Sequence, residues 1–278
     1  MSITDPLATP DRIAFIGDMH GDFGFGARAL TYAAERCATV AIQCGDFGFW
    51  RLDEAFVAGV SAVACTLKLP LLWVDGNHEH HPELAAVPID PATGLRPIAP
   101  GVWHLPRGFR WTWAGVRFLA LGGAYSIDRT GRTPGLDWFP EESLSPAELS
   151  AAAVGGPADV MICHDAPAGA KIPDEAFEMF PRGTWSPRDI RASDQHREGL
   201  RFVTDQVRPR WLFHGHYHVR YVDELLGEGY RCTVHGLAAN RTATLSRAVF
   251  VQPLRMFTPT AERPAAVTDA DRRTSRSR

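Results

Sequence analysis

The sequence predicts an α/β fold in which parallel strands alternate with helices, and three observations lead to this prediction. Short apolar runs recur along the chain, and the first of them end in polar turns that contain glycine and aspartate. Stretches of helical length separate these runs, which is the pattern of βαβ units. With 45% hydrophobic and 22% charged residues, the 278-residue chain has a globular composition and can bury a large core.

Three strands and two helices are expected before Pro82. The predicted strands are residues 12–17, 40–44 and 71–74, and the predicted helices between them are residues 26–37 and 53–68. Each of these strands ends in a polar loop. Because sites in open α/β sheets gather at the carboxyl ends of strands, we expect the three loops to meet in one crevice.

Beyond Pro82 the pattern changes to short β-like runs with turns between them, which predicts a meander of antiparallel strands. These runs are residues 101–105, 109–113 and 116–121. Ser145 and Glu148 form a capping box with a proline at the first helical position, so a helix is expected from there to about Val154.

The second half of the chain adds two buried strands that are followed by histidines, at residues 159–163 and 211–213. A helix is expected between them at residues 193–208, because its apolar residues fall on one helical face. Two more strand-like runs lie near residues 230–234 and 248–251.

One domain is expected, over residues 12–257, with an N-terminal extension at residues 1–11 and a disordered, arginine-dotted tail at residues 258–278. The net charge of −3 excludes a global attraction to nucleic acid or to an anionic membrane. The longest apolar stretch stops at Lys68, well short of the ~20 residues of a membrane span, and no signal peptide is expected. The five cysteines are scattered, which favours small buried thiols in a reducing cytoplasm.

Five polar clusters stand at the ends of predicted strands. They are Asp18 with His20, Asp46, Asn77 with His78, His164, and His216 with His218. Their nitrogen and oxygen donors suit Mn²⁺, Fe or Zn²⁺, and none is a thiolate. Each cluster alone is weak evidence, but all five in this order predict a two-metal site. One carboxylate must bridge the ions, because two cations ~3.5–4 Å apart repel each other strongly.

This order of motifs resembles the calcineurin-like metallophosphoesterase family. The matching motifs are Gly17-Asp18-Met19-His20, Gly45-Asp46, Gly76-Asn77-His78-Glu79, a strand-final His164 and Gly215-His216-Tyr217-His218. The resemblance spans about residues 12–220, and the spacings of 28 residues from Asp18 to Asp46 and 31 from Asp46 to Asn77 are similar to those of the family. It implies a four-layer αββα sandwich, with two mixed β-sheets flanked by helices, around a dinuclear metal site that hydrolyses phosphate esters.

Carried over residue by residue, the resemblance implies two sets of ligands that share one carboxylate. Asp18, His20, Asp46 and His218 would hold one ion, and Asp46, Asn77, His164 and His216 would hold the other. Two divalent transition-metal ions are expected, with Mn²⁺ first and Fe, Zn²⁺ or Mg²⁺ as alternatives. A hydroxide that bridges the ions would attack phosphorus in line.

His78 is the catalytic residue that the resemblance implies beside these ligands. It would stabilise the phosphoryl oxygens or protonate the leaving group, and the alternative is a neutral histidine that shapes the loop. In an extended segment, alternation would place the two later histidines, His216 and His218, on the same side of the backbone.

One departure from the family pattern concerns the residues after Asp46. Many relatives have a second acid where this chain has Phe49, and the phosphate-binding arginine of the serine/threonine protein phosphatases is missing from its usual place, although Arg51 is one residue away. A protein-phosphatase function is therefore disfavoured. The aromatic residues Phe47, Phe49 and Trp50 could form a wall for a nucleobase, but such a cluster is more often core.

Two segments that follow strand ends are expected to select the substrate. The loop at residues 122–132 carries Arg129 and Arg132, whose guanidinium groups could clamp a phosphate, although an ordinary solvated loop is almost as common. Residues 166–191 hold four prolines and three bulky aromatic residues, so an ordered insertion or lid is expected there rather than a linker.

Three further polar residues follow predicted ligands in the sequence. Asp165 could orient the imidazole of His164, because metal-bound histidines usually need such a partner. His80 and His81 could touch substrate, but solvated loop residues are the more common case.

The sequence thus predicts a cytoplasmic, metal-dependent hydrolase of a phosphomonoester or phosphodiester, with a slight preference for a nucleotide or a nucleic-acid end. No membrane partner is expected, and the oligomeric state is left open. The alternative is a noncatalytic interaction scaffold with the same fold. A scaffold has no physical need for seven costly polar residues that converge on one crevice, so the enzyme is favoured.

Overall fold

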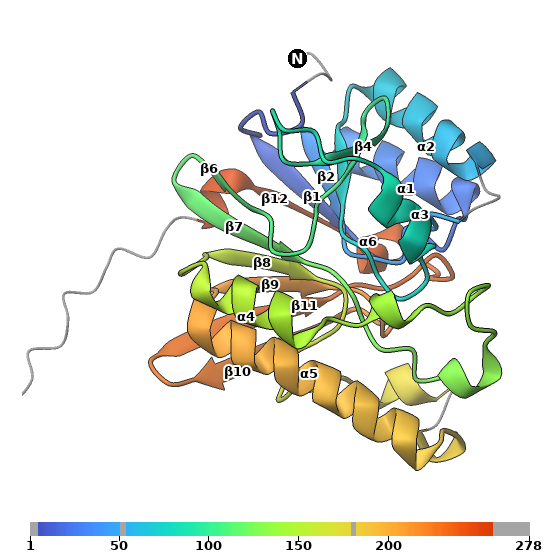
Figure 1. Cartoon of the computed structure of the whole chain (residues 1–278). Helices are drawn as coiled ribbons and strands as arrows, with labels where there is room; N and C mark the ends of the chain where they lie inside the picture. The colour runs from blue at the N-terminus through green and yellow to red at the C-terminus, as the bar shows by residue number, and fades with distance from the viewer. Residues whose placement is uncertain (1–4, 51–53, 179–181, 258–278) are drawn as a thin grey trace, which may run out of the picture.

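The computed structural model of the chain describes residues 5–50, 54–178 and 182–257. Two six-stranded sheets face each other, and helices lie against the outer face of each sheet (Figure 1). The expected four-layer αββα sandwich of two mixed sheets is confirmed.

The first sheet contains the strands β1 (Arg12–Ile16), β2 (Val40–Gln43), β3 (Leu71–Trp73), β4 (Arg96–Ala99), β5 (Val102–His104) and β12 (Val249–Pro253). Their order is β12-β1-β2-β3-β5-β4. The four inner strands run parallel, and the two edge strands are antiparallel to their neighbours.

The second sheet repeats this plan with the strands β6 (Arg110–Trp113), β7 (Val116–Leu121), β8 (Val160–Cys163), β9 (Trp211–His214), β10 (Tyr221–Gly227) and β11 (Tyr230–Gly236). Their order is β10-β11-β9-β8-β7-β6, again with four parallel inner strands and antiparallel edges. Parallel strands that are covered on both faces read as continuous apolar runs, which explains why the inner strands are visible in the sequence.

The first sheet is covered by α1 (Phe23–Glu35), α2 (Glu54–Leu67) and the short α3 (His81–Ala86), and the second sheet by α4 (Pro146–Val154) and α5 (Pro187–Val207) (Figure 1). A further short helix, α6 (Leu245–Ala248), precedes β12. Single turns of 3₁₀ helix are η1 (Arg129–Gly131), η2 (Pro140–Glu142), η3 (Asp174–Phe177), η4 (Arg182–Thr184) and η5 (Leu254–Phe257). The predicted capping box is present at the start of α4.

The strand β1 shows how one apolar run serves two cores. Ala14 and Ile16 face α1 and α2, whereas Ile13 and Phe15 face the second sheet. The Phe15 ring stacks on Phe213 of β9, with ring centroids 3.7 Å apart. Because successive strand residues point to opposite faces, a strand between two layers must be apolar at every position. A third core lies between the second sheet and its two helices.

The predicted antiparallel meander after Pro82 is wrong in part. Only β6 and β7 form the expected antiparallel pair, whereas β5 belongs to the first sheet and lies parallel to β3. The chain therefore crosses between the sheets after β5. The strands β4 and β10 were not predicted, because edge strands that are half exposed lack a continuous apolar run.

The helix α5 and the N-terminal segment both differ from what the sequence predicts. The helix predicted from residue 193 begins at Pro187, where Ser186 caps it by accepting the backbone N–H of Asp189. Residues 5–11 lie against the domain, since the Trp113 indole donates to the Leu7 carbonyl (2.8 Å).

The tail predicted at residues 258–278 lies outside the described residues. Among the helices described, none has both the length and the apolar character that crossing a bilayer requires.

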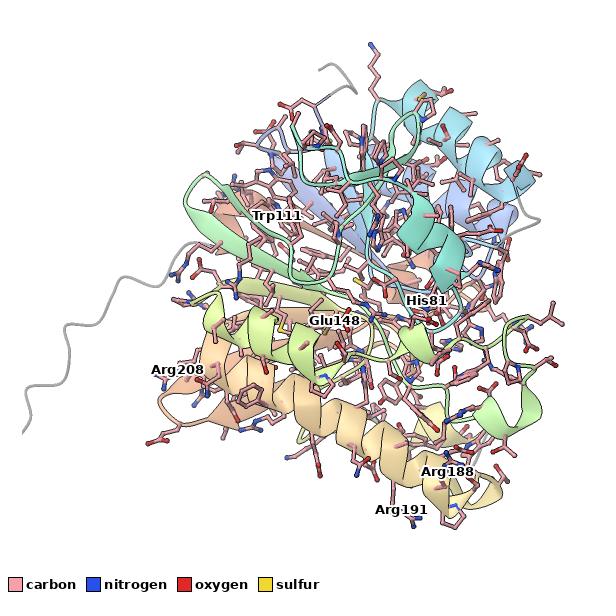
Figure 2. The ribbon with its side chains drawn as sticks, in the orientation of Figure 1. His81, Trp111, Glu148, Arg188, Arg191 and Arg208 are labelled. Atoms are coloured by element: carbon pink, nitrogen blue, oxygen red, sulfur yellow. The ribbon has the colours of Figure 1, made fainter. Side chains whose placement is uncertain are left out.

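A buried ion pair stabilises the segment after β5, where the chain passes from the first sheet to the second. Asp75, which follows β3, is 2% exposed, and it accepts hydrogen bonds from Arg107 Nε (2.8 Å) and Nη2 (2.6 Å). The same guanidinium donates to Glu148 (3.2 Å) at the start of α4, and Figure 2 labels that side chain. Burial alone would raise the pKa of Asp75, but the Arg107 charge and the His104 hydrogen bond hold it well below its usual range.

We expect Arg107→Ala to lower the free energy of unfolding by about 3–5 kcal/mol, because it leaves a buried carboxylate without its cation. Urea unfolding followed by far-UV circular dichroism measures the change. The matched control is Arg231→Ala, whose guanidinium is 68% exposed and pairs with Glu224 on the surface. That exposed pair should contribute less than about 1 kcal/mol. Equal losses for the two variants would contradict the structural role of Arg107.

Candidate metal centre

The loops that follow five inner strands converge on one site between the two sheets. These strands are β1, β2 and β3 of the first sheet and β8 and β9 of the second. All seven predicted ligands lie in these loops: Asp18, His20, Asp46, Asn77, His164, His216 and His218. Their convergence follows from the parallel strands, whose carboxyl ends share one edge of each sheet.

Four of these side chains lie close enough together to hold one metal ion. A ligand atom from each of Asp18, His20, Asp46 and His218 lies within 4.8 Å of the others. The shortest approaches are 3.1 Å from His218 Nε2 to Asp18 Oδ2 and 3.3 Å from His20 Nε2 to Asp46 Oδ2. These four residues are the set predicted for the first ion.

A second group lies on the other side of the Asp46 carboxylate. His164 Nε2 is 3.3 Å from Asp46 Oδ1 and 3.2 Å from Asn77 Oδ1. The same amide oxygen is 3.1 Å from His216 Nδ1. These donors belong to the set predicted for the second ion.

Asp46 connects the two groups, because its two carboxylate oxygens face different partners. Oδ2 approaches His20, whereas Oδ1 approaches His164 and accepts the backbone N–H of His78 (2.8 Å). The residue is 1% exposed. A carboxylate in this position can offer one oxygen to each of two cations, which is the arrangement that a dinuclear site requires.

The backbone of the ligand loops is strained. His20, Asp46, His216 and His218 have φ angles of +48°, +54°, +67° and +59°. Residues with a side chain rarely adopt this left-handed conformation, which costs of order 1–3 kcal/mol each and is concentrated at functional sites. The prediction that His216 and His218 share one side of a regular extended strand is therefore wrong, and local turns aim their rings instead.

Glycines before the ligands let the loops approach closely. A Cβ atom on Gly76 would lie 2.2 Å from Asp46 Oδ1, and one on Gly215 would lie 1.9 Å from Asp18 Oδ1. Both distances are far inside van der Waals contact. Space therefore requires glycine before Asn77 and before His216 in this structure.

The charges of the site favour bound cations. Burial disfavours ionised Asp46, but the charge of His164 and the hydrogen bonds of His164 and His20 outweigh it and hold the pKa well below its usual range. Burial would lower the pKa of His20 as well, yet the hydrogen bond and charge of Asp46 raise it to about 9. Despite burial, the Asp46 carboxylate likewise raises the pKa of His164 to about 10, so protons on His20 and His164 balance the buried carboxylates, and divalent cations could take over that role.

The residues present fit two divalent transition-metal ions. The donors are carboxylate oxygens, one amide oxygen and imidazole nitrogens, a set that suits Mn²⁺, Fe and Zn²⁺. The His164 Nδ1–H donates to the Cys44 carbonyl (2.8 Å), which leaves Nε2 facing the site. His20 Nδ1 contacts Asn240 Oδ1 (3.2 Å), so its Nε2 is also directed inward. Partners of this kind fix a ligand imidazole in its tautomer and orientation.

The amide of Asn77 is oriented by a buried polar chain. Its Nδ2 donates to Ser126 Oγ (3.0 Å), and that hydroxyl donates to Glu142 (2.7 Å). Glu142 also accepts the backbone N–H of Ser126 (2.7 Å). Because an amide has one donor end and one acceptor end, this contact turns the oxygen of Asn77 toward His164 and His216.

The hypothesis that Asp165 orients His164 is wrong. Asp165 instead accepts hydrogen bonds from His196 Nδ1 (2.8 Å) and from the Tyr217 hydroxyl (2.7 Å). It therefore fixes the residue between the two ligands of the last motif, His216 and His218. The partner of His164 is a backbone carbonyl, which side-chain patterns in a sequence do not reveal.

Glu79, the last residue of the Gly76 motif, ties two ligand loops together. Its buried carboxylate accepts the backbone N–H groups of Gly48 (3.2 Å) and Gly76. Burial and the nearby charge of Asp46 raise the pKa of Glu79 to about 8. The residue therefore links the loop after β2 to the loop after β3.

His78 lies beside the shared carboxylate and against an arginine. Its Nε2 is 4.0 Å from Asp46 Oδ2, and its side chain is 29% exposed. Arg132 Nη1 and Nη2 lie 3.1 and 2.9 Å from its two ring nitrogens. Asp128 holds this guanidinium through contacts of 2.8 Å to Nε and 2.9 Å to Nη2. Arg132 thus lines the cavity, pairs with Asp128 and lies against His78, and its role as a phosphate clamp stays a prediction.

The structure does not bring Arg129, the other predicted substrate contact, to the site. Its guanidinium carbon lies 4.0 Å from the centre of the Trp138 ring, which is a cation–π contact. Sequence position alone did not separate the two arginines of this loop, because both lie on the same short turn.

A cavity of about 200 Å³ opens beside the candidate ligands. It is lined by Asp46, Asn77, His78, His216 and His218 on one side, and by Ile127, Asp128, Arg132, Ala176, Phe177, Trp185, Ser193, Arg197 and Tyr217 on the others. Residues from both segments predicted to select the substrate, 122–132 and 166–191, therefore stand at the site.

The three aromatic residues after Asp46 divide between core and site. Phe47 is fully buried and stacks on Trp73, with ring centroids 4.7 Å apart. Phe49 packs partly buried against the same core. Only Trp50 lies near the site, with its ring centroid 6.4 Å from that of His78. The interpretation that these aromatic residues belong to the core is thus confirmed for Phe47 and Phe49.

His80 and His81 do not line the cavity, and neither is a solvated loop residue. His80 caps α3 by accepting the backbone N–H of Glu83 (3.3 Å). His81 is 6% exposed, and Figure 2 labels it on α3. The adjacent short helix, which was not predicted, explains both placements.

Comparison with known proteins identifies the family. The model of the calcineurin-like phosphoesterase family matches residues 11–220, which include every candidate ligand. The chain belongs to this family. No curated protein sequence matches it. Membership indicates phosphoester hydrolysis, and the dinuclear site is the one that the family implies.

Two solved structures have folds similar to that of this chain. A dimetal phosphatase from Danio rerio is 15% identical with a TM-score of 0.55, and the match covers 90% of this chain and 93% of that one. The protein TT1561 of Thermus thermophilus is 13% identical with a TM-score of 0.53, over 88% of this chain and 99% of that one. At these identities the likeness shows the fold.

After reconstitution with Mn²⁺, this phosphoesterase is expected to hold close to two ions per chain, because Asp46 is shared by two groups of donors. Asp46→Asn should lose both ions, since it removes the charge that both need. Elemental analysis after dialysis measures the content, and Glu224→Gln on the exposed face of β10 is the control. One ion or none in the wild-type protein, found reproducibly, would contradict the dinuclear site.

Arg132→Ala is expected to lower kcat by about tenfold or more on every substrate, because a misplaced catalytic group can cost up to about 10²-fold. Arg129→Ala, the neighbouring control, should change kcat less than about twofold, since its side chain stacks on Trp138 outside the cavity. Steady-state kinetics separates kcat from KM. If Arg132→Ala raises KM and leaves kcat unchanged, the prediction is wrong and Arg132 acts as a phosphate clamp.

Proposed function

We propose that this protein hydrolyses a phosphomonoester or a phosphodiester at the dinuclear centre, with Mn²⁺ as the metal and a nucleotide or a nucleic-acid end as the preferred substrate. The single observation that carries the proposal is the position of Asp46, whose two oxygens face the two groups of donors. Family membership supports the reaction class. The cytoplasmic location stays a prediction from the sequence.

Two sets of side chains would each bind one of the two ions, and Asp46 would belong to both sets. Asp18, His20 and His218 would complete the first set around the shared carboxylate. Asn77, His164 and His216 would complete the second. When bound, two such ions would supply a nucleophile from water at neutral pH and neutralise charge on the phosphoryl oxygens.

His78 is the residue that we place in the reaction itself. It lines the cavity, lies 4.0 Å from the shared carboxylate, and is held by the guanidinium of Arg132. From there its ring can donate a hydrogen bond to a phosphoryl oxygen or give a proton to the leaving oxygen. Burial and the Arg132 charge lower its pKa, although Asp46 opposes this. The lowered pKa favours the hydrogen-bonding role, because the neutral ring still donates an N–H, whereas proton transfer requires the imidazolium.

The alternative function is a noncatalytic scaffold that uses the same fold for an interaction. Four strained backbone positions among the candidate ligands argue against it, because strain of this kind persists where the site itself needs it. Turnover of a chromogenic phosphodiester and a chromogenic phosphomonoester with added Mn²⁺ distinguishes the two functions. A metal-loaded protein that hydrolyses neither ester would favour the scaffold.

His78→Asn is expected to keep both ions and to reduce turnover by about 10²-fold or more, the usual contribution of one acid–base or electrostatic group. The variant His80→Asn serves as a control, because His80 caps α3 and does not line the cavity. Elemental analysis and kinetics on an ester with a poor leaving group are measured on the same preparation. An unchanged rate for His78→Asn would remove this residue from the mechanism.

A further inference from the structure

The cavity beside the metal centre has an apolar wall that the metal ligands do not explain. Ile127, Phe177, Trp185 and Tyr217 line it, and they come from three separate segments. Phe177 and Tyr217 meet edge to face, with ring centroids 6.2 Å apart. All four residues are only partly buried, so each keeps surface that a bound group can contact. Aromatic faces of this kind stack on flat rings.

The size of the cavity limits what it can hold. Its volume of about 200 Å³ is below the range of about 300–1,000 Å³ that is typical of small-molecule pockets. Room for one ring system beside the phosphate is therefore available, whereas a folded or polymeric group would have to extend outside.

Among the described residues that line the cavity, both arginines are already engaged in hydrogen bonds. Asp128 pairs with Arg132, and the fork of Arg197 donates to the carbonyls of Ala166 (3.2 Å) and Ala170 (3.2 Å). No arginine is left free for a second phosphate on these described walls, so a polyphosphate fits poorly inside the cavity. The Asp128 carboxylate and the Ser193 hydroxyl add polar groups to the lining of the cavity.

We infer that this wall is a subsite for the aromatic group of a small phosphate ester, with the ring stacked between Trp185 and its aromatic neighbours and the phosphate directed to the metal centre. The inference rests on the proposed function, because it names the organic part of the same substrate. A nucleobase and a phenyl ring share the required chemistry, a flat apolar face on a neutral group.

Kinetics on three esters tests the subsite. The Mn²⁺-loaded wild-type protein is assayed on phenyl phosphate, adenosine monophosphate and glycerol phosphate. We expect kcat/KM for at least one aromatic ester to exceed that for glycerol phosphate by about tenfold or more, within the range that stacking supplies. Preference for the nucleotide alone identifies a nucleobase site, and preference for the phenyl ester alone identifies an aryl site.

Variants at the wall separate stacking from folding. Trp185→Ala should lower the ratio of aromatic to glycerol ester kcat/KM by about 5- to 100-fold, and Trp185→Phe should restore much of it. Phe202→Ala is the matched control, because Phe202 lies on α5, is 49% exposed and does not line the cavity. Its ratio should equal that of the wild type.

A binding assay separates failure of the subsite from failure of the proposed function. Adenosine and phenol are titrated into metal-free protein by isothermal calorimetry, and one of them should bind the wild type more tightly than Trp185→Ala. If glycerol phosphate and the aromatic esters are hydrolysed equally, and Trp185→Ala changes neither ratio nor binding, the subsite is wrong while the function stands. If no ester is hydrolysed but binding depends on Trp185, the function fails and the subsite stands.

Discussion

The rest of the site depends on a single carboxylate that is reached from both sheets. Asp46 follows β2 of the first sheet, and the histidine that approaches its Oδ1, His164, follows β8 of the second. The residue itself adopts a left-handed backbone, and its carbonyl accepts the N–H groups of Met19 (3.0 Å) and His20 (2.8 Å). Side chain and backbone of one residue thus connect four ligand loops. If the two sheets were shifted relative to each other, these four loops would no longer meet at Asp46.

The parallel inner strands and the ligand order could be predicted from the sequence for a physical reason. Strands buried on both faces must be apolar at nearly every position, and the polar residues that end them stand out against that background. The convergence of those ends follows from the topology. The edge strands β4 and β10 and the crossing after β5 could not be predicted, because they are half exposed and their partners are set by tertiary contacts.

The details of the site that sequence reasoning missed share another cause. His164 is oriented by a backbone carbonyl, and His20 by Asn240, which lies 220 residues away in the chain. Arg129 and Arg132 have the same residue type on one turn, yet one stacks on an indole while the other lies against His78. Such assignments depend on rotamers and distant partners, which periodicity and spacing do not encode. The strained φ angles of four candidate ligands are likewise a property of the folded loops.

The most direct measurement of the shared carboxylate is an anomalous-difference map from crystals grown with Mn²⁺. The account predicts two peaks about 3.5–4 Å apart on either side of the Asp46 carboxylate. One peak should lie among Asp18, His20 and His218, and the other among the donors of the second group. A single peak, or two peaks that both lie on one side of Asp46, would contradict the dinuclear centre on which the proposed hydrolysis depends.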